Sequence, residues 1–104
     1  MTFVDQRRCR IPGCVDRSRP HQHHAVYVQE VRRHGGALLD PRNALTLCVH
    51  HHGRHHSRQE PVPLRVLRRE NIEFAVELMG APAAYEYLRR RYVGDDPRLE
   101  ALIA

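Results

Sequence analysis

The chain has 104 residues and a formal net charge of +5, a length that fits one domain with a small core. It contains no apolar run near the ~20 residues that a membrane-spanning helix needs, and its first residues lack the apolar stretch of a secretory signal. These features exclude membrane-spanning and exported classes, and we expect a soluble, cytoplasmic protein.

The positive charge is spread unevenly, and every one of the 17 basic side chains is an arginine. Residues 1–69 carry 13 arginines against 5 acids, a net charge of +8, whereas residues 70–104 carry 4 arginines against 7 acids, a net charge of −3. Because the arginine fork matches phosphate oxygens, the basic part favours a nucleic-acid partner. The alternative is a solvated surface, and the charge alone does not decide between them.

The first feature in chain order is Cys9 and Cys14, which flank a Pro-Gly turn. That spacing lets both sulfurs face one ion, as in a zinc knuckle. Three cysteines cannot all form disulfides, and without an export signal a metal site is the favoured use of the thiolates. Ordinary buried thiols are the alternative.

A strand is predicted over residues 23–29, which are rich in β-branched and aromatic side chains. Alternation along this strand puts His24, Val26 and Val28 on one face, and His23 on the other face or at the strand edge.

Loop signals follow between residues 35 and 41, where the chain has a Gly-Gly pair and an Asp-Pro step. Residues 43–48 alternate in character and predict a second strand, so that the two strands form a hairpin. A short helix is predicted over residues 49–57, which would place His52 and His56 one turn apart.

Three helices are predicted in the remaining chain. The first covers residues 70–79 and ends at Gly80, the second covers residues 82–92, and a short third begins at Asp96-Pro97 and runs through Ile103. Large apolar and aromatic residues recur at helical spacing, and we interpret them as core rather than as a base-stacking platform. These residues are Phe74, Leu78, Tyr85, Tyr87, Leu88 and Tyr92.

A second knuckle is indicated by Cys48 and His51, which have the C-x-x-H spacing. Together with Cys9 and Cys14 they can close a tetrahedral zinc shell without an open position, so this zinc would be structural. His50 is the rival for the fourth ligand. Catalysis would then need a second metal ion held by other residues.

Three motifs in this order resemble the HNH endonuclease family: His23-His24, then Gly35-Gly36, then the run from Asn43 through Cys48 to His52. The resemblance covers roughly residues 9–56. In that family a histidine ends the first strand, an asparagine lies five residues before a cysteine, and a histidine directly follows the second knuckle. Here His23 stands where an aspartate is usual, His51 stands where a cysteine is usual, and the stretch from His24 to Gly35 is longer than usual.

The resemblance implies a metal-dependent DNA endonuclease in which His24 is the general base that activates the attacking water. His23 and His52 would hold one divalent ion (Mg²⁺, Mn²⁺, Ni²⁺ or Zn²⁺), with His56 as a less certain third ligand. Asn43 would tie the loop to the hairpin and help to orient His24. A neutral imidazole with a pKa near ~6.5 suits the base role.

The predicted fold class is α+β, with a zinc-stapled ββα-metal unit over residues 9–58 and a mainly helical part over residues 63–104 that packs on it. The expected partner is DNA, with a homodimer or phage packaging proteins as further possibilities. Phosphate contacts are expected from arginines that flank the site. These are Arg32, Arg33, Arg54 and Arg58. The alternatives are a non-catalytic zinc-finger module that binds nucleic acid and a metal buffer.

Overall fold

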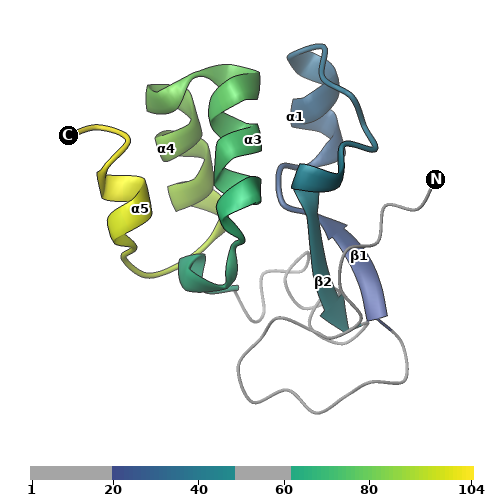
Figure 1. The fold of residues 1–104 in the computed structure, drawn as a ribbon, viewed down its shortest axis with the longest axis horizontal. Coiled ribbons are helices and arrows are strands. Elements are labelled where there is room, and N and C mark those ends of the chain that lie inside the picture. The colour runs from purple at the N-terminus through teal and green to yellow at the C-terminus, as the bar shows by residue number, and fades with distance from the viewer. Residues whose placement is uncertain (1–19, 49–61) are drawn as a thin grey trace.

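The computed structural model describes residues 20–48 and 62–104, which form an α+β domain with a two-stranded antiparallel sheet and several helices (Figure 1). The predicted helix over residues 49–57 lies outside the described residues.

The sheet consists of β1 (Pro20–His24) and β2 (Ala44–Cys48). The strands are antiparallel, with Pro20 opposite Cys48 and His24 opposite Ala44. The predicted second strand and the antiparallel pairing are therefore confirmed. His24 is the last residue of β1, so the chain leaves the sheet directly after it.

The predicted continuation of the first strand through residue 29 is wrong. Residues 25 and 26 form a bend and α1 (Val28–Arg33) follows, so that Val28 lies in a helix and not beside His24 on a strand. The reason is tertiary, because Asn43 binds both backbone groups of Val26 and the hydroxyl of Tyr87 accepts a hydrogen bond from the Tyr27 N–H at 2.9 Å. These contacts take backbone groups that a longer strand would need.

Helix α1 ends at the glycine pair that the sequence marks as loop. Gly35 has a φ of 72°, which glycine adopts without steric cost. Its N–H donates to the carbonyl of Arg32 at 3.1 Å, and the Gly36 N–H donates to the carbonyl of Val31 at 2.9 Å. This double closure is a Schellman motif, and it turns the chain back towards the 3-10 helix η1 (Pro41–Asn43) that precedes β2.

The C-terminal part begins with the 3-10 helix η2 (Leu64–Val66) and continues as the three predicted helices, which are confirmed with small changes of boundary. Gly80, with a φ of 87°, ends the first of them, and the Asp96 side chain caps the last by accepting from the Arg98 N–H. The helices are α3 (Arg69–Met79), α4 (Ala81–Arg91) and α5 (Pro97–Glu100).

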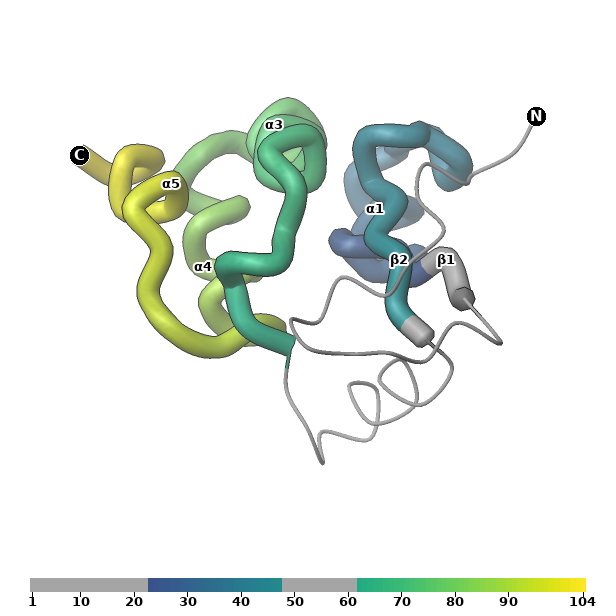
Figure 2. The backbone as a smooth tube through the Cα atoms, turned by 60° about the horizontal axis from the view of Figure 1, so that its bottom comes forward, coloured from purple at the N-terminus to yellow at the C-terminus, as the bar shows by residue number. Residues whose placement is uncertain are grey.

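One apolar core joins the two parts of the chain. In both views α3 lies in the middle of the molecule (Figures 1 and 2). The two strands and α1 lie on one side of α3, and α5 lies on the other side. The interpretation of the C-terminal aromatic residues as core is confirmed, because Phe74, Tyr87, Leu88 and Tyr92 are buried and Leu78 and Tyr85 pack against the same cluster. Buried side chains of the first part, such as Leu45 and Leu47, belong to it too.

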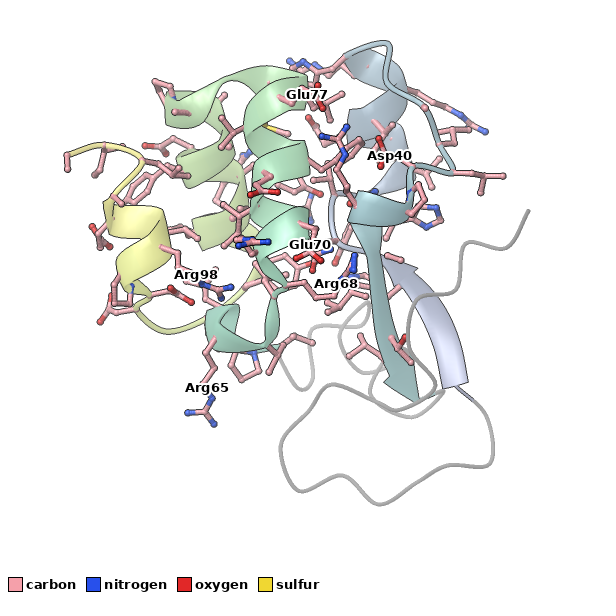
Figure 3. The ribbon with its side chains drawn as sticks, viewed as in Figure 1. Asp40, Arg65, Arg68, Glu70, Glu77 and Arg98 are labelled. Atoms are coloured by element: carbon pink, nitrogen blue, oxygen red, sulfur yellow. The ribbon has the colours of Figure 1, made fainter. Side chains whose placement is uncertain are left out.

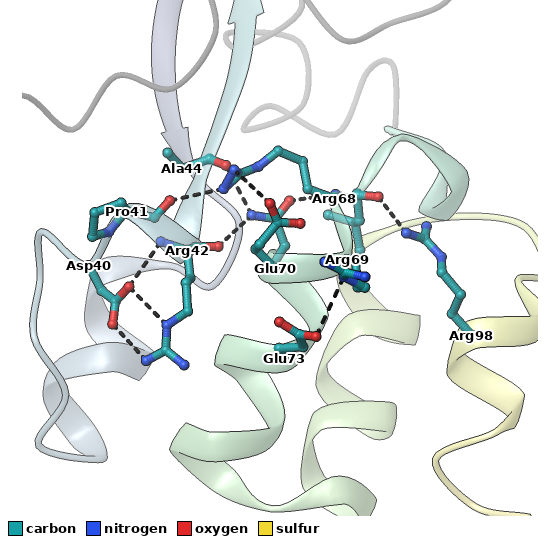
Figure 4. Close-up of polar contacts among 11 residues, drawn as sticks. Asp40, Pro41, Arg42, Ala44, Arg68, Arg69, Glu70, Glu73 and Arg98 are labelled. Carbon is teal, nitrogen blue, oxygen red and sulfur yellow. Dashed lines mark hydrogen bonds and ion pairs between the residues drawn. The ribbon is translucent and has the colours of Figure 1, made fainter.

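Polar contacts close the seam between η1 and α3 (Figure 4). The Asn71 amide donates to the carbonyls of Arg42 at 2.8 Å and Ala44 at 3.0 Å, and the Arg68 guanidinium donates to the carbonyl of Pro41 at 3.0 Å. Asn71 is fully buried, so these bonds satisfy its amide group inside the protein. The start of β2 is therefore fixed to the first turn of α3.

None of the helices within residues 20–48 and 62–104 has the length and apolar content that a bilayer crossing requires.

Candidate active site

His24 lies where β1 ends, and its side chain is half-buried. Burial lowers the pKa of His24 below the usual histidine value, and a hydrogen bond to the backbone of Leu38 acts in the opposite direction. The net direction is downward, so the ring is neutral at neutral pH. A neutral imidazole can accept a proton, which is the property that a general base needs.

The segment directly after His24 is held by Asn43, which is fully buried at the end of η1. The Asn43 Oδ1 accepts from the Val26 N–H at 2.7 Å, and its Nδ2 donates to the Val26 carbonyl at 2.9 Å. The Asn43 carbonyl also accepts from the Ala25 N–H at 2.9 Å. One residue therefore satisfies three backbone groups in the turn that follows His24.

His23 lies on the core side of β1, since neighbouring residues of a strand face opposite sides and only 1% of His23 is exposed. Its Nε2 lies 3.2 Å from the Tyr92 hydroxyl oxygen, and its ring meets the Tyr27 ring edge to face at 5.5 Å. The Nε2 atom is therefore engaged within the protein. A ligand role for His23 would have to use the other ring nitrogen, Nδ1.

The predicted arginines Arg32 and Arg33 lie in the last turn of α1, and both are exposed. Arg33 pairs with Glu30 at 3.5 Å across one turn of the helix. An exposed pair of this kind contributes ~0–1 kcal/mol, so it holds the guanidinium only weakly. Both positions are accessible to a phosphate backbone.

Cys48 is the last residue of β2 and lies opposite Pro20. The other predicted ligand, catalytic and DNA-contacting residues lie outside the described part of the chain. These are Cys9, Cys14, His51, His52, Arg54, His56 and Arg58. Among residues 20–48 and 62–104, no three His, Cys, Asp or Glu side chains gather as a metal site.

The structure adds contacts to the site that the sequence did not predict. They come from α4 and the residue that follows it. The Tyr92 hydroxyl donates to the Ala25 carbonyl at 2.6 Å, and the Tyr87 hydroxyl accepts from the Tyr27 N–H. The Arg91 guanidinium lies over the Tyr27 ring, 4.8 Å from its centre. The helical spacing of these tyrosines correctly indicates core, but it carries no signal for the partners of the hydroxyl groups.

A separate pocket of about 250 Å³ lies between α3 and the segment before β2. The charged side chains in its wall pair with one another, because Arg42 contacts both Asp40 and Glu77 and lies over the Phe74 ring. Figure 3 shows Glu77 on α3 facing the segment that carries Asp40. None of the predicted site residues lines this pocket, and its paired charges are explained by the seam between the two parts of the chain.

Comparison of the chain with protein-family models, with curated proteins and with solved structures finds no match.

Proposed function

We propose that the protein is a metal-dependent DNA endonuclease that hydrolyses phosphodiester bonds, with His24 as the general base. The observation that carries the proposal is the position of His24 at the end of β1, where its pKa is lowered and the turn behind it is clamped by Asn43. A base whose backbone is held on both sides can keep one orientation towards a water molecule.

The strand pairing supports the predicted zinc staple. Residues 1–19 precede Pro20, and residues 49–61 follow Cys48. Pro20 and Cys48 are partners in the sheet. The two predicted knuckles therefore leave from the same end of the strand pair. We propose that Cys9, Cys14, Cys48 and His51 bind structural zinc there, since four such ligands form a closed tetrahedral shell.

The chain length also allows the predicted meeting of His24 with His52. The two ends of β1 are separated by roughly 13 Å at ~3.3 Å per residue, and the four steps from Cys48 to His52 can span up to about 14 Å. A chain that turns back along the sheet after Cys48 can therefore bring His52 towards His24. In the predicted helix over residues 49–57 the same four steps would rise only about 6 Å, so the side chains of His24 and His52 would have to close the remaining distance.

We propose that His23 and His52 hold one divalent ion, with His56 as a third ligand. The residue chemistry fits, because imidazole nitrogens suit several of the first-row ions and an imidazole that hydrogen-bonds through one nitrogen can bind an ion through the other. Such an ion supplies charge stabilisation to the scissile phosphate and the departing oxygen. His24 takes the proton from water, and Arg32 and Arg33 contact the DNA backbone.

The test is cleavage of supercoiled plasmid by the purified full chain with each of Mg²⁺, Mn²⁺, Ni²⁺ and Zn²⁺. The parent should nick the plasmid with at least one ion, and His24→Ala should lose at least ~100-fold in rate. His34→Ala is the matched control, because His34 is an exposed histidine that contacts Glu30 and has no proposed role in the reaction. This variant should cleave like the parent. Binding without nicking under every ion would favour the zinc-finger alternative.

A further inference from the structure

The Arg91 guanidinium, in the last turn of α4, lies over two tyrosine rings at once. Its central carbon is 4.8 Å from the centre of the Tyr27 ring and 5.6 Å from the centre of the Tyr87 ring. The two rings meet edge to face, with their centres 6.4 Å apart. A cation is attracted by the negative face of an aromatic ring, so the two tyrosines together restrict where this guanidinium lies.

Arg91 has no acidic partner in the described part of the chain. Arg89, on the same helix, pairs with Asp95 and Glu100. Arg91 forms neither an ion pair nor a hydrogen bond within residues 20–48 and 62–104. None of its nitrogen atoms is among the buried, unbonded side-chain atoms of these residues, so its N–H groups reach solvent. A ring contact leaves the charge in place, and Arg91 therefore keeps its charge and its N–H donors for an anion from outside.

Glu30 is an acidic residue near this cluster, and its carboxylate contacts other side chains. Burial raises the pKa of Tyr87 to about 12, while the charge of Arg91 acts to lower it and the charge of Glu30 acts to raise it. The Glu30 carboxylate lies 3.5 Å from Arg33 and 3.5 Å from His34. It is therefore shared with the last turn of α1 and does not pair with Arg91.

This cation lies beside the turn that follows the proposed base. Tyr27 is the third residue after His24 and immediately precedes α1. Its N–H donates to the Tyr87 hydroxyl at 2.9 Å, so the two rings beneath Arg91 belong to the residues that hold this turn. The position of the Arg91 charge is therefore fixed relative to the chain that carries His24.

We infer that Arg91 binds a backbone phosphate of the DNA next to the phosphodiester on which His24 acts. This inference rests on the proposed function for the identity of the substrate. A guanidinium presents a planar fork that matches two phosphate oxygens, and it remains charged at every working pH. The tyrosine rings hold this fork before DNA binds, which lowers the side-chain entropy lost in the contact.

A purely structural role for Arg91 predicts a different result. A positive charge in the last turn of α4 stabilises the helix dipole, and the ring contacts stabilise the fold. Both effects change the free energy of unfolding, but neither changes the number of counterions that are released when DNA binds. The salt dependence of the DNA affinity therefore separates the two roles.

The experiment measures binding of the full chain to a fluorescent DNA duplex by anisotropy, without added divalent ion, from about 0.05 M to 0.2 M salt. For Arg91→Gln we expect the slope of log affinity against log salt to become shallower by ~0.9, which corresponds to one lost phosphate contact. The affinity at ~0.1 M salt should fall by about 5-fold to 10-fold. Arg65→Gln is the matched control, because Arg65 is an exposed arginine whose side chain points away from the fold (Figure 3). It should keep the parent's slope.

Arg91→Lys separates the charge from the packing. Its ammonium group can still neutralise a phosphate, so we expect the parent's slope, with an affinity a few-fold lower because the planar fork is lost. Circular dichroism confirms that each variant is folded. An unchanged slope in Arg91→Gln would overturn the inference, as would an equal loss in Arg65→Gln or in Arg91→Lys.

Plasmid nicking with added ions is scored separately, so the two proposals can fail independently. A shallower slope in Arg91→Gln, together with a parent that cuts no DNA under any ion, would refute the nuclease and leave the phosphate contact intact. A parent that nicks DNA while Arg91→Gln keeps the parent's slope would refute only the role of Arg91.

Discussion

At the scale of single residues, the turn after His24 is stabilised mainly by side chains bonded to its backbone. Asn43 reaches Val26 from 17 positions away, and the tyrosine hydroxyls reach Tyr27 and Ala25 from 60 and 67 positions away. Each of these polar atoms is buried or partly buried, so the loss of a partner leaves a backbone group without its hydrogen bond. The position of His24 therefore depends on Asn43 and the two tyrosines, which have no proposed chemical role in the cleavage reaction.

Asn43→Ala tests this dependence directly. The substitution removes both bonds to the Val26 backbone inside the core, and we expect the free energy of unfolding to fall by about 2–4 kcal/mol. Urea denaturation measures the loss. The cleavage rate, measured where the variant remains folded, should fall as well, since the turn that holds His24 loses its clamp.

Leu99→Ala is the control for a general loss of stability. Leu99 is fully buried in α5 and belongs to the core but not to the turn, and its truncation should cost about 2–5 kcal/mol. Its cleavage rate per folded molecule should match the parent. If Leu99→Ala and Asn43→Ala slow cleavage equally, Asn43 has no specific role in orienting His24.

Asp96 provides a prediction of how stability depends on pH. Hydrogen bonds from Arg98 hold the pKa of Asp96 below its usual range, so this carboxylate stabilises the fold above the unfolded pKa of about 3.9, and the contribution is lost as the pH falls through the lower folded pKa. Asp96→Asn keeps an oxygen to cap α5 but loses the ion pair. We expect about 1 kcal/mol lower stability at pH 7, and a difference that shrinks towards pH 3.

Urea unfolding at several pH values measures this difference. Asp95→Asn is the matched control, because the Asp95 side chain is 89% exposed whereas that of Asp96 is 6% exposed. The stability of Asp95→Asn should follow the parent at every pH. A constant gap between Asp96→Asn and the parent from pH 7 to pH 3 would show that the ion pair does not contribute.

At the scale of elements, the helices of the C-terminal part and the second strand could be predicted from local sequence. Gly80 ends α3, Pro82 lies in the first turn of α4, and the Asp96-Pro97 step begins α5. Helix α1 does not follow in this way. Its first residues continue a β-branched and aromatic run, and only contacts from Tyr87 and Asn43 redirect the chain. The Gly35-Gly36 pair, read as loop, was an available signal for the end of a helix.

Gly36, which follows α1, has little room for a side chain beside Leu78 of α3. A Cβ atom at this position would lie 2.6 Å from Leu78 Cδ1 and 3.1 Å from Val31 Cγ1. We expect Gly36→Ala to destabilise the fold by about 1 kcal/mol through overpacking, because the end of the Leu78 side chain can move aside whereas Val31 is fully buried. Thermal or urea unfolding measures this cost.

A double-mutant cycle with Leu78→Ala separates crowding from backbone effects. The cost of Gly36→Ala should fall clearly when Leu78 is truncated, because the closest contact is removed. Gly35→Ala is the control, since an added Cβ at Gly35 meets open space. Its cost should come only from the strain of alanine at a positive φ, about 1 kcal/mol. An unchanged cost of Gly36→Ala in the Leu78→Ala background would rule out the contact as its cause.

At the scale of the whole molecule, the resemblance implied part of the arrangement, with His24 at the end of the first strand and Asn43 tied to the loop, but the sequence did not predict the tertiary contacts around them. The end of β1 at His24 and the buried Asn43 set the geometry around His24. The contribution of α4 was not foreseen, because a tyrosine at core spacing does not reveal what its hydroxyl binds. Tertiary hydrogen bonds of this kind have no local pattern.

Cys14→Ser tests the proposed staple for the whole chain. A small metal-bound domain draws part of its folding free energy from the ion, so the variant should lose zinc and unfold at a lower temperature. Zinc content by atomic absorption and the melting temperature measure both effects. Retained zinc together with an unchanged melting temperature would show that Cys14 is not a ligand.

The central claim is that an exchangeable ion binds beside His24, and NMR of the histidine rings during Mn²⁺ titration tests it most directly. Paramagnetic Mn²⁺ broadens signals of nearby rings, and His34, on the exposed end of α1, provides an internal reference. We predict that the His24 ring signals disappear well below equimolar Mn²⁺ while those of His34 persist. Persistence of the His24 signals at excess Mn²⁺, or equal loss of both sets, would contradict the account.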